Sequence, residues 1–296
     1  MRRALLKNAK ENSMKMLFFL CGLVSVGFVL CISIYLFVAG IPAFKVIGIS
    51  DMLFGKVWLP TASTTEPSFG ILPFILTSIW GTAGAIMIGV PIGLLTAIYV
   101  AKAAPKKVAT AIRTSVQLLA GIPSVVYGMI GMVVLVPLIQ RTFDLTSGAT
   151  LMAAIIVLAI MILPSIINVS ETALSAVPAE YEEASMALGA TKEETWFRVT
   201  LPAARSGVAT AIVLGIGRAI GEAMAIIMVS GNVANMPGLF KSVRFMTTAI
   251  ASEMSYAAVG SLHRDALFSI GLVLFLFIML INLGLKFFIR EKKEET

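Results

Sequence analysis

Six apolar stretches of membrane-spanning length constrain the fold of this chain more than any other feature. A helix that crosses the hydrocarbon core of a bilayer needs about 20 mostly apolar residues. Charged residues make up only 13% of the sequence, against roughly 25% in a typical soluble domain. The stretches cover residues 17–39, 72–100, 116–139, 151–168, 208–229 and 266–288. The sequence therefore predicts an all-α polytopic membrane protein with six transmembrane helices.

The distribution of basic residues predicts the orientation of these helices. Of the 23 Lys and Arg residues, 16 lie in the N-terminal tail, the second and fourth loops and the C-terminal tail. Basic residues are enriched on the cytoplasmic side of membrane proteins, so both termini are predicted to be cytoplasmic. Six spans also require both termini on one side. The formal net charge of +7 is therefore explained by topology, and we expect no nucleic acid partner.

The cytoplasmic loop between the fourth and fifth spans, residues 169–206, is predicted to form two short helices. Pro178 fits the first position of a helix, and Gly189 suits a C-terminal cap. Thr191 with Glu194 forms a capping box that begins a second helix. From the residues alone, this hairpin either joins two spans at the membrane surface or docks a cytoplasmic partner.

A motif in this hairpin resembles the EAA loop of ABC importer permeases. The order Glu-Ala-Ser from Glu183, then Gly189, then Leu-Pro at 201–202 follows the family spacing. We expect the second helix of the hairpin to end at this Leu-Pro pair. The resemblance implies that the hairpin is a coupling helix seated in a cleft of an ATPase subunit. The residues that it assigns to ATPase coupling are Glu183, Ala184, Gly189, Leu201 and Pro202.

The fifth predicted span carries two charged residues, Arg218 and Glu222, among glycines and apolar residues. A charge near the centre of a bilayer costs at least about 2.5 kcal/mol. The two residues are four positions apart, so on one continuous helix they would pair. This pair either locks the helix to its neighbours or places a positive group on an anion pathway, with Glu222 holding the guanidinium. The planar fork of Arg matches the geometry of an oxyanion.

Further stretches resemble one kind of importer. The run RAIGE at residues 218–222 is similar to that of several oxyanion importers, including molybdate and sulfate permeases. Other stretches resemble the PstC-type permease subunit of phosphate ABC importers. They are GIPSVVYG at 121–128, GEAMA at 221–225, VSGN at 229–232, WLP at 58–60 and FGILP at 69–73. This resemblance implies the type I ABC importer permease fold and a translocation pathway lined by Arg218 and Glu222.

The same resemblance implies a role and a set of partners. The chain would be a permease subunit of an ATP-driven phosphate importer in a bacterial or archaeal cell membrane, forming half of the pathway. A PstA-like permease, two copies of an ABC ATPase and an extracytoplasmic phosphate-binding protein would be its partners. We expect no enzymatic activity and no cofactor in the chain itself, because its sequence has no phosphate-cradling GxxxxGK[ST] loop. ATP would be used by the partner subunit.

Three regions follow from the resemblance. Residues 1–70 would hold the N-terminal cytoplasmic tail, the first transmembrane helix and an external loop. Residues 71–288 would form the ABC transmembrane type-1 core of five helices, with the coupling hairpin at 170–206. Residues 289–296 would be a cytoplasmic tail.

Two other functions remain open at this point. One is a permease for another tetrahedral oxyanion, such as sulfate or molybdate. The other is an ion-coupled secondary transporter, which would need ionisable or broken-helix sites in both halves of the chain. The single histidine, His263, is interpreted as an exposed loop residue without a catalytic or metal-binding role. Cys21 and Cys31 lie ten positions apart in one predicted helix, so we expect no disulfide between them.

Overall fold

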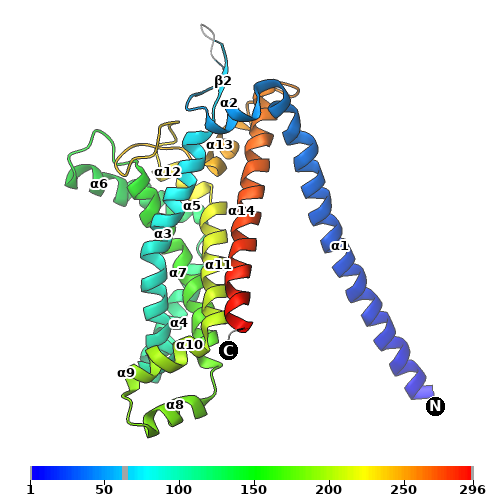
Figure 1. The fold of residues 1–296 in the computed structure, drawn as a ribbon, viewed down its shortest axis with the longest axis vertical. Coiled ribbons are helices and arrows are strands. Elements are labelled where there is room, and N and C mark those ends of the chain that lie inside the picture. The colour runs from blue at the N-terminus through cyan, green and yellow to red at the C-terminus, as the bar shows by residue number, and fades with distance from the viewer. Residues whose placement is uncertain (1, 62–65, 295–296) are drawn as a thin grey trace.

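The computed structural model describes residues 2–61 and 66–294, and helices make up most of this part of the chain (Figure 1). The elements are, in chain order, α1 (Arg2–Ile47), α2 (Ile49–Phe54), β1 (Trp58–Leu59), β2 (Ser68–Phe69), α3 (Leu72–Ile98), the π-helical turn η1 (Tyr99–Ala103), α4 (Lys106–Gly121), α5 (Ser124–Ile130), the π-helical turn η2 (Gly131–Leu135), α6 (Val136–Thr142), α7 (Leu151–Ser175), α8 (Ala179–Ala187), α9 (Lys192–Thr195), the π-helical turn η3 (Trp196–Thr200), α10 (Leu201–Ala203), α11 (Arg205–Gly221), α12 (Met224–Val229), α13 (Met246–Glu253) and α14 (Leu262–Glu294).

The described residues contain five helices that are long and apolar enough to cross a membrane. A sixth span is completed when the pair Lys192–Ala203 and Arg205–Gly221, which is bent by 74°, is counted as one. This agrees with the predicted all-α membrane protein. Both chain ends lie at the end of the molecule that carries α8 and α9 (Figure 1). That placement is what an even number of spans requires.

Two of the predicted spans are interrupted in the structure. The third begins at Ser124 and runs to Thr142, whereas residue 116 was expected as its start. Pro123 disfavours helical conformation in the residue before it, and Ile122 is accordingly extended between α4 and α5. The fifth predicted span, 208–229, is also interrupted. There α11 ends at Gly221 and α12 begins only at Met224.

Helices α3 and α7 pack tightly against each other, and small residues make this possible. Gly89 and Gly93 of α3 face Ile162 and Ile166 of α7. A Cβ atom at either glycine would lie 2.8 Å from an isoleucine carbon. Glycines allow two backbones to approach in this way in membranes, where packing rather than water drives helix association. As a result, α7 is the most deeply buried of the candidate spans.

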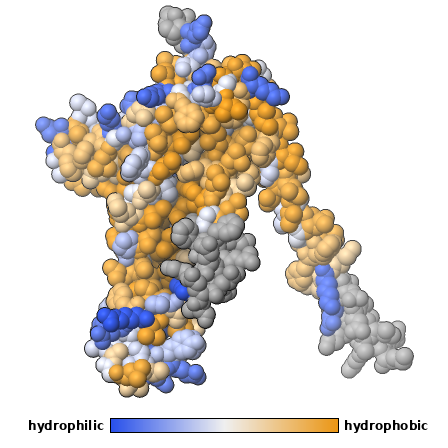
Figure 2. All heavy atoms as spheres, in the orientation of Figure 1, coloured by the Kyte–Doolittle hydropathy of each residue, from blue (hydrophilic) through white to orange (hydrophobic). Residues whose placement is uncertain are grey.

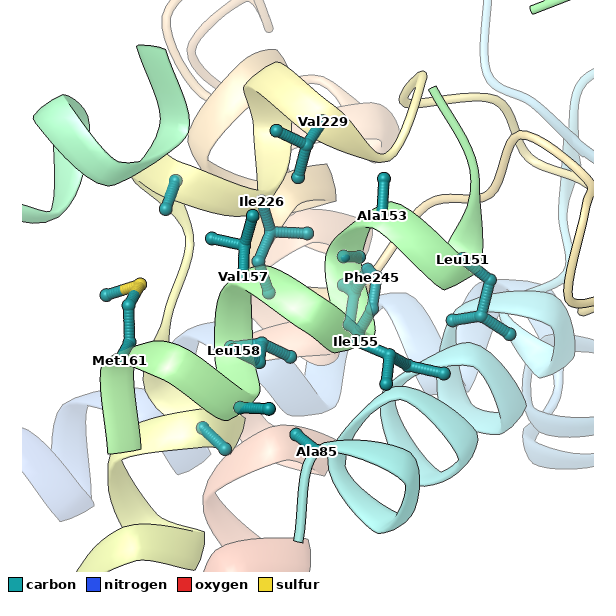
Figure 3. Close-up of a cluster of buried hydrophobic side chains, with 14 of the residues drawn as sticks. Ala85, Leu151, Ala153, Ile155, Val157, Leu158, Met161, Ile226, Val229 and Phe245 are labelled. Carbon is teal, nitrogen blue, oxygen red and sulfur yellow. The ribbon is translucent and has the colours of Figure 1, made fainter. Parts of the chain in front are cut away.

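Buried apolar side chains form a core around the first half of α7. Figure 3 shows Leu151, Ala153, Ile155, Val157 and Leu158 of α7 in this cluster. They meet side chains from α12 and α3, together with a ring from the segment before α13, and these partners are Ile226, Val229, Ala85 and Phe245. The core therefore holds the short α12 in place beside the long helices.

A second layer of structure covers the end of the molecule opposite α8 and α9. It contains α2, the antiparallel β1–β2 pair and α13 (Figure 1). Trp58 of β1 pairs with Phe69 of β2, and the buried ring of Trp58 contacts the rings of both Phe69 and Phe74. From this end α1 runs away from the bundle, with Gly40 packed against Leu272 of α14. We call α2, the β1–β2 pair and α13, with the segments that join them at this extracytoplasmic end, the cap.

The surface has the distribution that a bilayer requires. Figure 2 shows hydrophobic residues over the middle of the visible face and hydrophilic residues gathered near the cap and near α8 and α9. Along α1, large apolar side chains such as Phe18, Phe28 and Val38 are exposed. The domain limits predicted above are not tested by these features.

Candidate functional site

Arg218 lies in the second half of α11 and is half-buried. Its Nη1 atom donates a long hydrogen bond of 3.5 Å to Ser165 Oγ of α7. A Cβ atom added at Gly217 or Gly221 would meet no atom within 4 Å. Position 221 is a neighbour of both 217 and 218 on the helix surface, four and three positions away. Arg218 therefore lies beside a face of α11 that this chain leaves open.

Glu222 has a different position from the one predicted. Because α11 ends at Gly221, the backbone of Glu222 is extended and the residue is not on the same helix face as Arg218. Its Oε1 atom accepts a hydrogen bond of 3.1 Å from the backbone N–H of Ala225, at the start of α12. Its carbonyl oxygen accepts one of 2.7 Å from Thr247 Oγ1. Among the described residues the structure shows no Arg218–Glu222 ion pair, so the predicted pairing along one helix is wrong.

The first half of the coupling hairpin follows its predicted capping residues closely. Gly189 has a φ of +92° just after α8, as a C-terminal glycine cap requires. Thr191 Oγ1 accepts a hydrogen bond from the Glu194 N–H at 3.2 Å, and Glu194 Oε2 accepts one from the Thr191 N–H at 3.0 Å. The predicted capping box is thereby confirmed. Pro178 is the N-cap of α8, one position before the first helical residue expected there.

The second half of the hairpin ends close to the predicted position. After α9 the chain stays helical through the π-helical turn η3 and the short α10, so that one helical segment runs from Lys192 to Ala203. The prediction that this helix ends at Leu201 and Pro202 is confirmed to within one residue. Proline has no N–H to donate within a helix and favours a break near it. The bend to α11 comes after this point, at Ala204.

The hairpin presents apolar side chains to its surroundings. None of the residues of α8 is buried, and Leu188 is 91% exposed just after it. Tyr181 is also more than half exposed, and Glu183 and Ala184 lie on the exposed surface of the same helix. Exposed apolar groups rimmed by polar residues mark interaction surfaces. The predicted coupling residues Glu183, Ala184 and Gly189 thus lie together on an accessible surface.

A buried polar cluster in the cap was missed from the sequence. The carboxylate of Glu253, at the end of α13, accepts hydrogen bonds from Trp58 Nε1 at 3.0 Å and pairs with Arg244. His263 Nε2 lies 2.8 Å from Glu253 Oε2. We call Trp58, Arg244, Glu253 and His263 the cap cluster. The interpretation of His263 as an exposed loop residue is wrong, because its side chain is only 8% exposed.

A signal for part of this cluster was present in the sequence. Arg244, Glu253 and His263 fall within one short external segment, and oppositely charged groups in such a segment are candidates for pairing. The contribution of Trp58 comes from a point 195 residues away along the chain and has no local signal. Across residues 2–61 and 66–294, no group of three or more His, Cys, Asp or Glu residues could hold a metal ion.

With this geometry in view, comparison with known proteins identifies the family. Residues 89–291 match the family model described as the binding-protein-dependent transport system inner membrane component. This chain belongs to that family. The permease is 40% identical over 269 residues to the probable ABC transporter permease protein YqgH of Bacillus subtilis, covering 88% of this chain and 86% of the relative. It is 35% identical over 270 residues to the phosphate transport system permease protein PstC of Pasteurella multocida, covering 83% of each.

Solved structures show the same fold at low sequence identity. A bacterial alginate ABC transporter, in complex with an alginate pentasaccharide-bound periplasmic protein, matches with a TM-score of 0.61 and 17% identity. The match covers 95% of this permease and 94% of that chain. An inward-facing MetNI methionine transporter matches with a TM-score of 0.55 and 22% identity, over 75% and 94% of the two chains. The predicted ABC importer permease fold is confirmed.

The family assignment decides several of the open points. The chain is a multi-pass inner-membrane permease of a binding-protein-dependent ABC importer, and it works with an ATPase and a periplasmic binding protein. It is a transport subunit without catalytic activity of its own. The ion-coupled secondary transporter is thereby set aside. The fold does not decide the transported substrate, because the solved transporters that share it are named for substrates as different as alginate and methionine.

Proposed function

We propose that this permease forms one half of the translocation pathway of a phosphate importer. Its partners in the membrane complex are a PstA-like permease and two copies of an ABC ATPase, and an extracytoplasmic phosphate-binding protein delivers the substrate. The chain binds no cofactor, and ATP is used by the partner subunit. Relatives named as phosphate transport system permeases support the substrate, at 35% identity in Pasteurella multocida and 34% in Mesorhizobium japonicum.

The position of Arg218 is the observation that carries this proposal. Among the described residues its one side-chain hydrogen bond is the 3.5 Å contact with Ser165, so most of the five N–H donors of the guanidinium are available to an anion. A cation in a membrane span is costly unless it meets a partner or a watery path. The open face at Gly217 and Gly221 provides such a path once a second permease encloses it.

The hairpin supplies the coupling half of the proposal. Glu183, Ala184 and Gly189 lie on the exposed surface of the hairpin beside the exposed side chain of Leu188. Leu201 and Pro202 begin the short α10, directly before the bend to α11. A cleft of the ATPase that receives α8 would therefore push on a hairpin connected to the helix that carries Arg218. Alternating access then follows from rigid movement of the spans around the pathway.

The test is phosphate uptake by Arg218 variants that insert and assemble normally. Hydrogen bonds to a charged group contribute about 1.5–3 kcal/mol, which is roughly a 10- to 100-fold effect. We therefore expect Arg218→Gln to lose phosphate uptake by at least about tenfold, and Arg218→Lys to retain part of it. Arg141→Gln, on the exposed surface at the end of α6, is the matched control.

The outcome also separates phosphate from other oxyanions. Glu222→Gln should have a smaller effect than Arg218→Gln, because the amide oxygen can still accept the hydrogen bond from Ala225.

Competition with sulfate, molybdate and arsenate measures selectivity in the same assay. Full uptake by Arg218→Gln would leave Arg218 with a structural role only. A wild-type permease that imports sulfate or molybdate in preference to phosphate would be assigned to another oxyanion.

A further inference from the structure

Glu182 of α8 has an environment unlike that of its acidic neighbours. The side chains of Glu180 and Glu183 are exposed, whereas that of Glu182 is 19% exposed. Its Oε1 atom lies 2.5 Å from Lys102 Nζ and accepts a hydrogen bond of 3.1 Å from Thr200 Oγ1. Lys102 is itself only 14% exposed at its side chain, and Thr200 is fully buried. One carboxylate oxygen therefore joins three separate segments.

Both partners of Glu182 lie on π-helical turns. Lys102 is in η1, which continues α3 directly at its cytoplasmic end. Thr200 is the last residue of η3, in the second half of the hairpin. Single π turns inside helices are rare and are frequent at functional sites, because they shift the direction of the side chains that follow them. Here the two turns aim a cation and a hydroxyl at the same carboxylate.

The rest of α8 offers little packing through which a force could pass. No residue of α8 is buried, so its apolar contacts with the membrane helices are slight. The hydroxyl groups of Ser185 and Thr195, 2.9 Å apart, tie α8 to α9 within the hairpin itself. In contrast, the Glu182–Lys102 pair reaches out of the hairpin to α3, whose glycine-rich face packs along α7. The pair is therefore a short polar link from the hairpin to the main helix pair of the bundle.

We propose that Glu182 and Lys102 act as a strut that transmits movement of α8 to the cytoplasmic end of α3. They are positioning residues for energy coupling, and this inference rests on the function proposed above. The strut is stiff because the pair is largely shielded from water. Opposite charges attract more strongly in such a shielded setting than at an open surface. Separating the two groups would leave a charge without a partner in this setting. Movement of α8 on an ATPase therefore carries η1 with it.

The number of phosphate ions imported per ATP hydrolysed distinguishes a coupling strut from an ion pair with a purely structural role. The permease is assembled with its second permease and ATPase in proteoliposomes, with the binding protein, phosphate and ATP supplied. Lys102→Met and Glu182→Gln remove the charge at nearly constant volume. Lys102→Arg keeps the charge and is the conservative rescue. Glu180→Gln removes an exposed carboxylate from the same helix and is the matched control.

We expect Lys102→Met and Glu182→Gln to retain the ATPase on co-purification and to hydrolyse ATP, while importing at least about fivefold less phosphate per ATP, since coupling energies typically correspond to 5- to 150-fold effects. Lys102→Arg should keep most of the wild-type ratio of phosphate to ATP that Lys102→Met loses, and Glu180→Gln should match the wild type. An unchanged ratio in Lys102→Met and Glu182→Gln would overturn the strut. Loss of the ATPase from both variants would also overturn it, because the pair would then only maintain the hairpin.

Failure of the phosphate assignment gives a separate result. A wild-type complex that hydrolyses ATP without importing phosphate counts against the proposed substrate alone. The same variants are then compared with sulfate or molybdate, whichever the wild type imports, and the ratio of imported ions to ATP again decides on the strut. If the wild type imports none of these anions, ATP hydrolysis stimulated by the loaded binding protein replaces uptake. A strut then predicts loss of that stimulation in Lys102→Met and not in Glu180→Gln.

Discussion

Replacing Glu253 with Gln is expected to destabilise the cap while leaving the rest of the permease folded. The carboxylate accepts a hydrogen bond from Trp58, pairs with Arg244 and lies 2.8 Å from His263. Its side chain is 5% exposed and that of Arg244 is 16% exposed, so water screens this pair only weakly. The amide of Gln can still accept a hydrogen bond from Trp58, but it leaves the guanidinium of Arg244 without a counter-charge.

The size of the effect follows from this loss of charge. Removing one partner of a buried ion pair costs about 3–5 kcal/mol. The lower end applies here, because Arg244 keeps two hydrogen bonds, of 3.0 and 2.8 Å, to the carbonyl oxygen of Asn232. At about 2–4 °C per kcal/mol for a chain of this size class, a loss of about 3 kcal/mol lowers the melting temperature by roughly 6–12 °C.

Thermal unfolding of the detergent-solubilised permease measures this difference. Glu66→Gln is the matched control, because it removes an exposed carboxylate from the same side of the membrane. The double variant Arg244→Met/Glu253→Gln removes both charges, so it should be less destabilised than the sum of the single variants. A melting temperature equal to wild type for Glu253→Gln, or strict additivity in the double variant, would refute the reasoning from a shielded ion pair.

Two further predictions concern the hairpin. Gly189→Ala should cost about 1–2 kcal/mol and raise amide exchange in α8; the cause is the φ of +92°, since a Cβ atom there would touch nothing within 4 Å. The hydrogen bond from the Thr191 N–H holds the pKa of the Glu194 carboxyl below its usual range. Its cap therefore contributes fully above the ordinary pKa of Glu and is lost as pH falls through the lowered value. As pH falls through this lowered pKa, amide exchange in α9 should rise more in the wild type than in Glu194→Gln. Equal dependence of exchange on pH in the two proteins would contradict this.

The parts of the fold that the sequence predicts well are those set by local chemistry. The number of spans follows from the length of apolar runs, which no distant residue alters. The caps at Gly189 and at Thr191–Glu194 depend on neighbours within a few positions. The break before Ser124 was also visible in principle, because Pro123 restricts the residue before it.

The errors arise where a distant partner decides the outcome. Glu222 appeared to pair with Arg218 because a continuous helix was assumed, but its backbone is extended and Thr247 donates to its carbonyl oxygen. His263 appeared exposed because the ring of Trp58, which packs against it, comes from a distant part of the chain. Likewise, nothing near Glu182 in the sequence indicates Lys102, 80 positions earlier by the numbering. Side chains that join separate elements are thus the ones that a linear pattern cannot place.

The cap cluster has a consequence for how the protein is made. Trp58 reaches the outer side of the membrane early in synthesis, whereas Glu253 follows 195 residues later and His263 lies in the first turn of the last helix. The four side chains can therefore meet only after the final segment has entered the bilayer. Until then Arg244 lacks its carboxylate partner, and the outer end of the protein is not fully packed. Closure of the cap thus marks a chain whose insertion is complete.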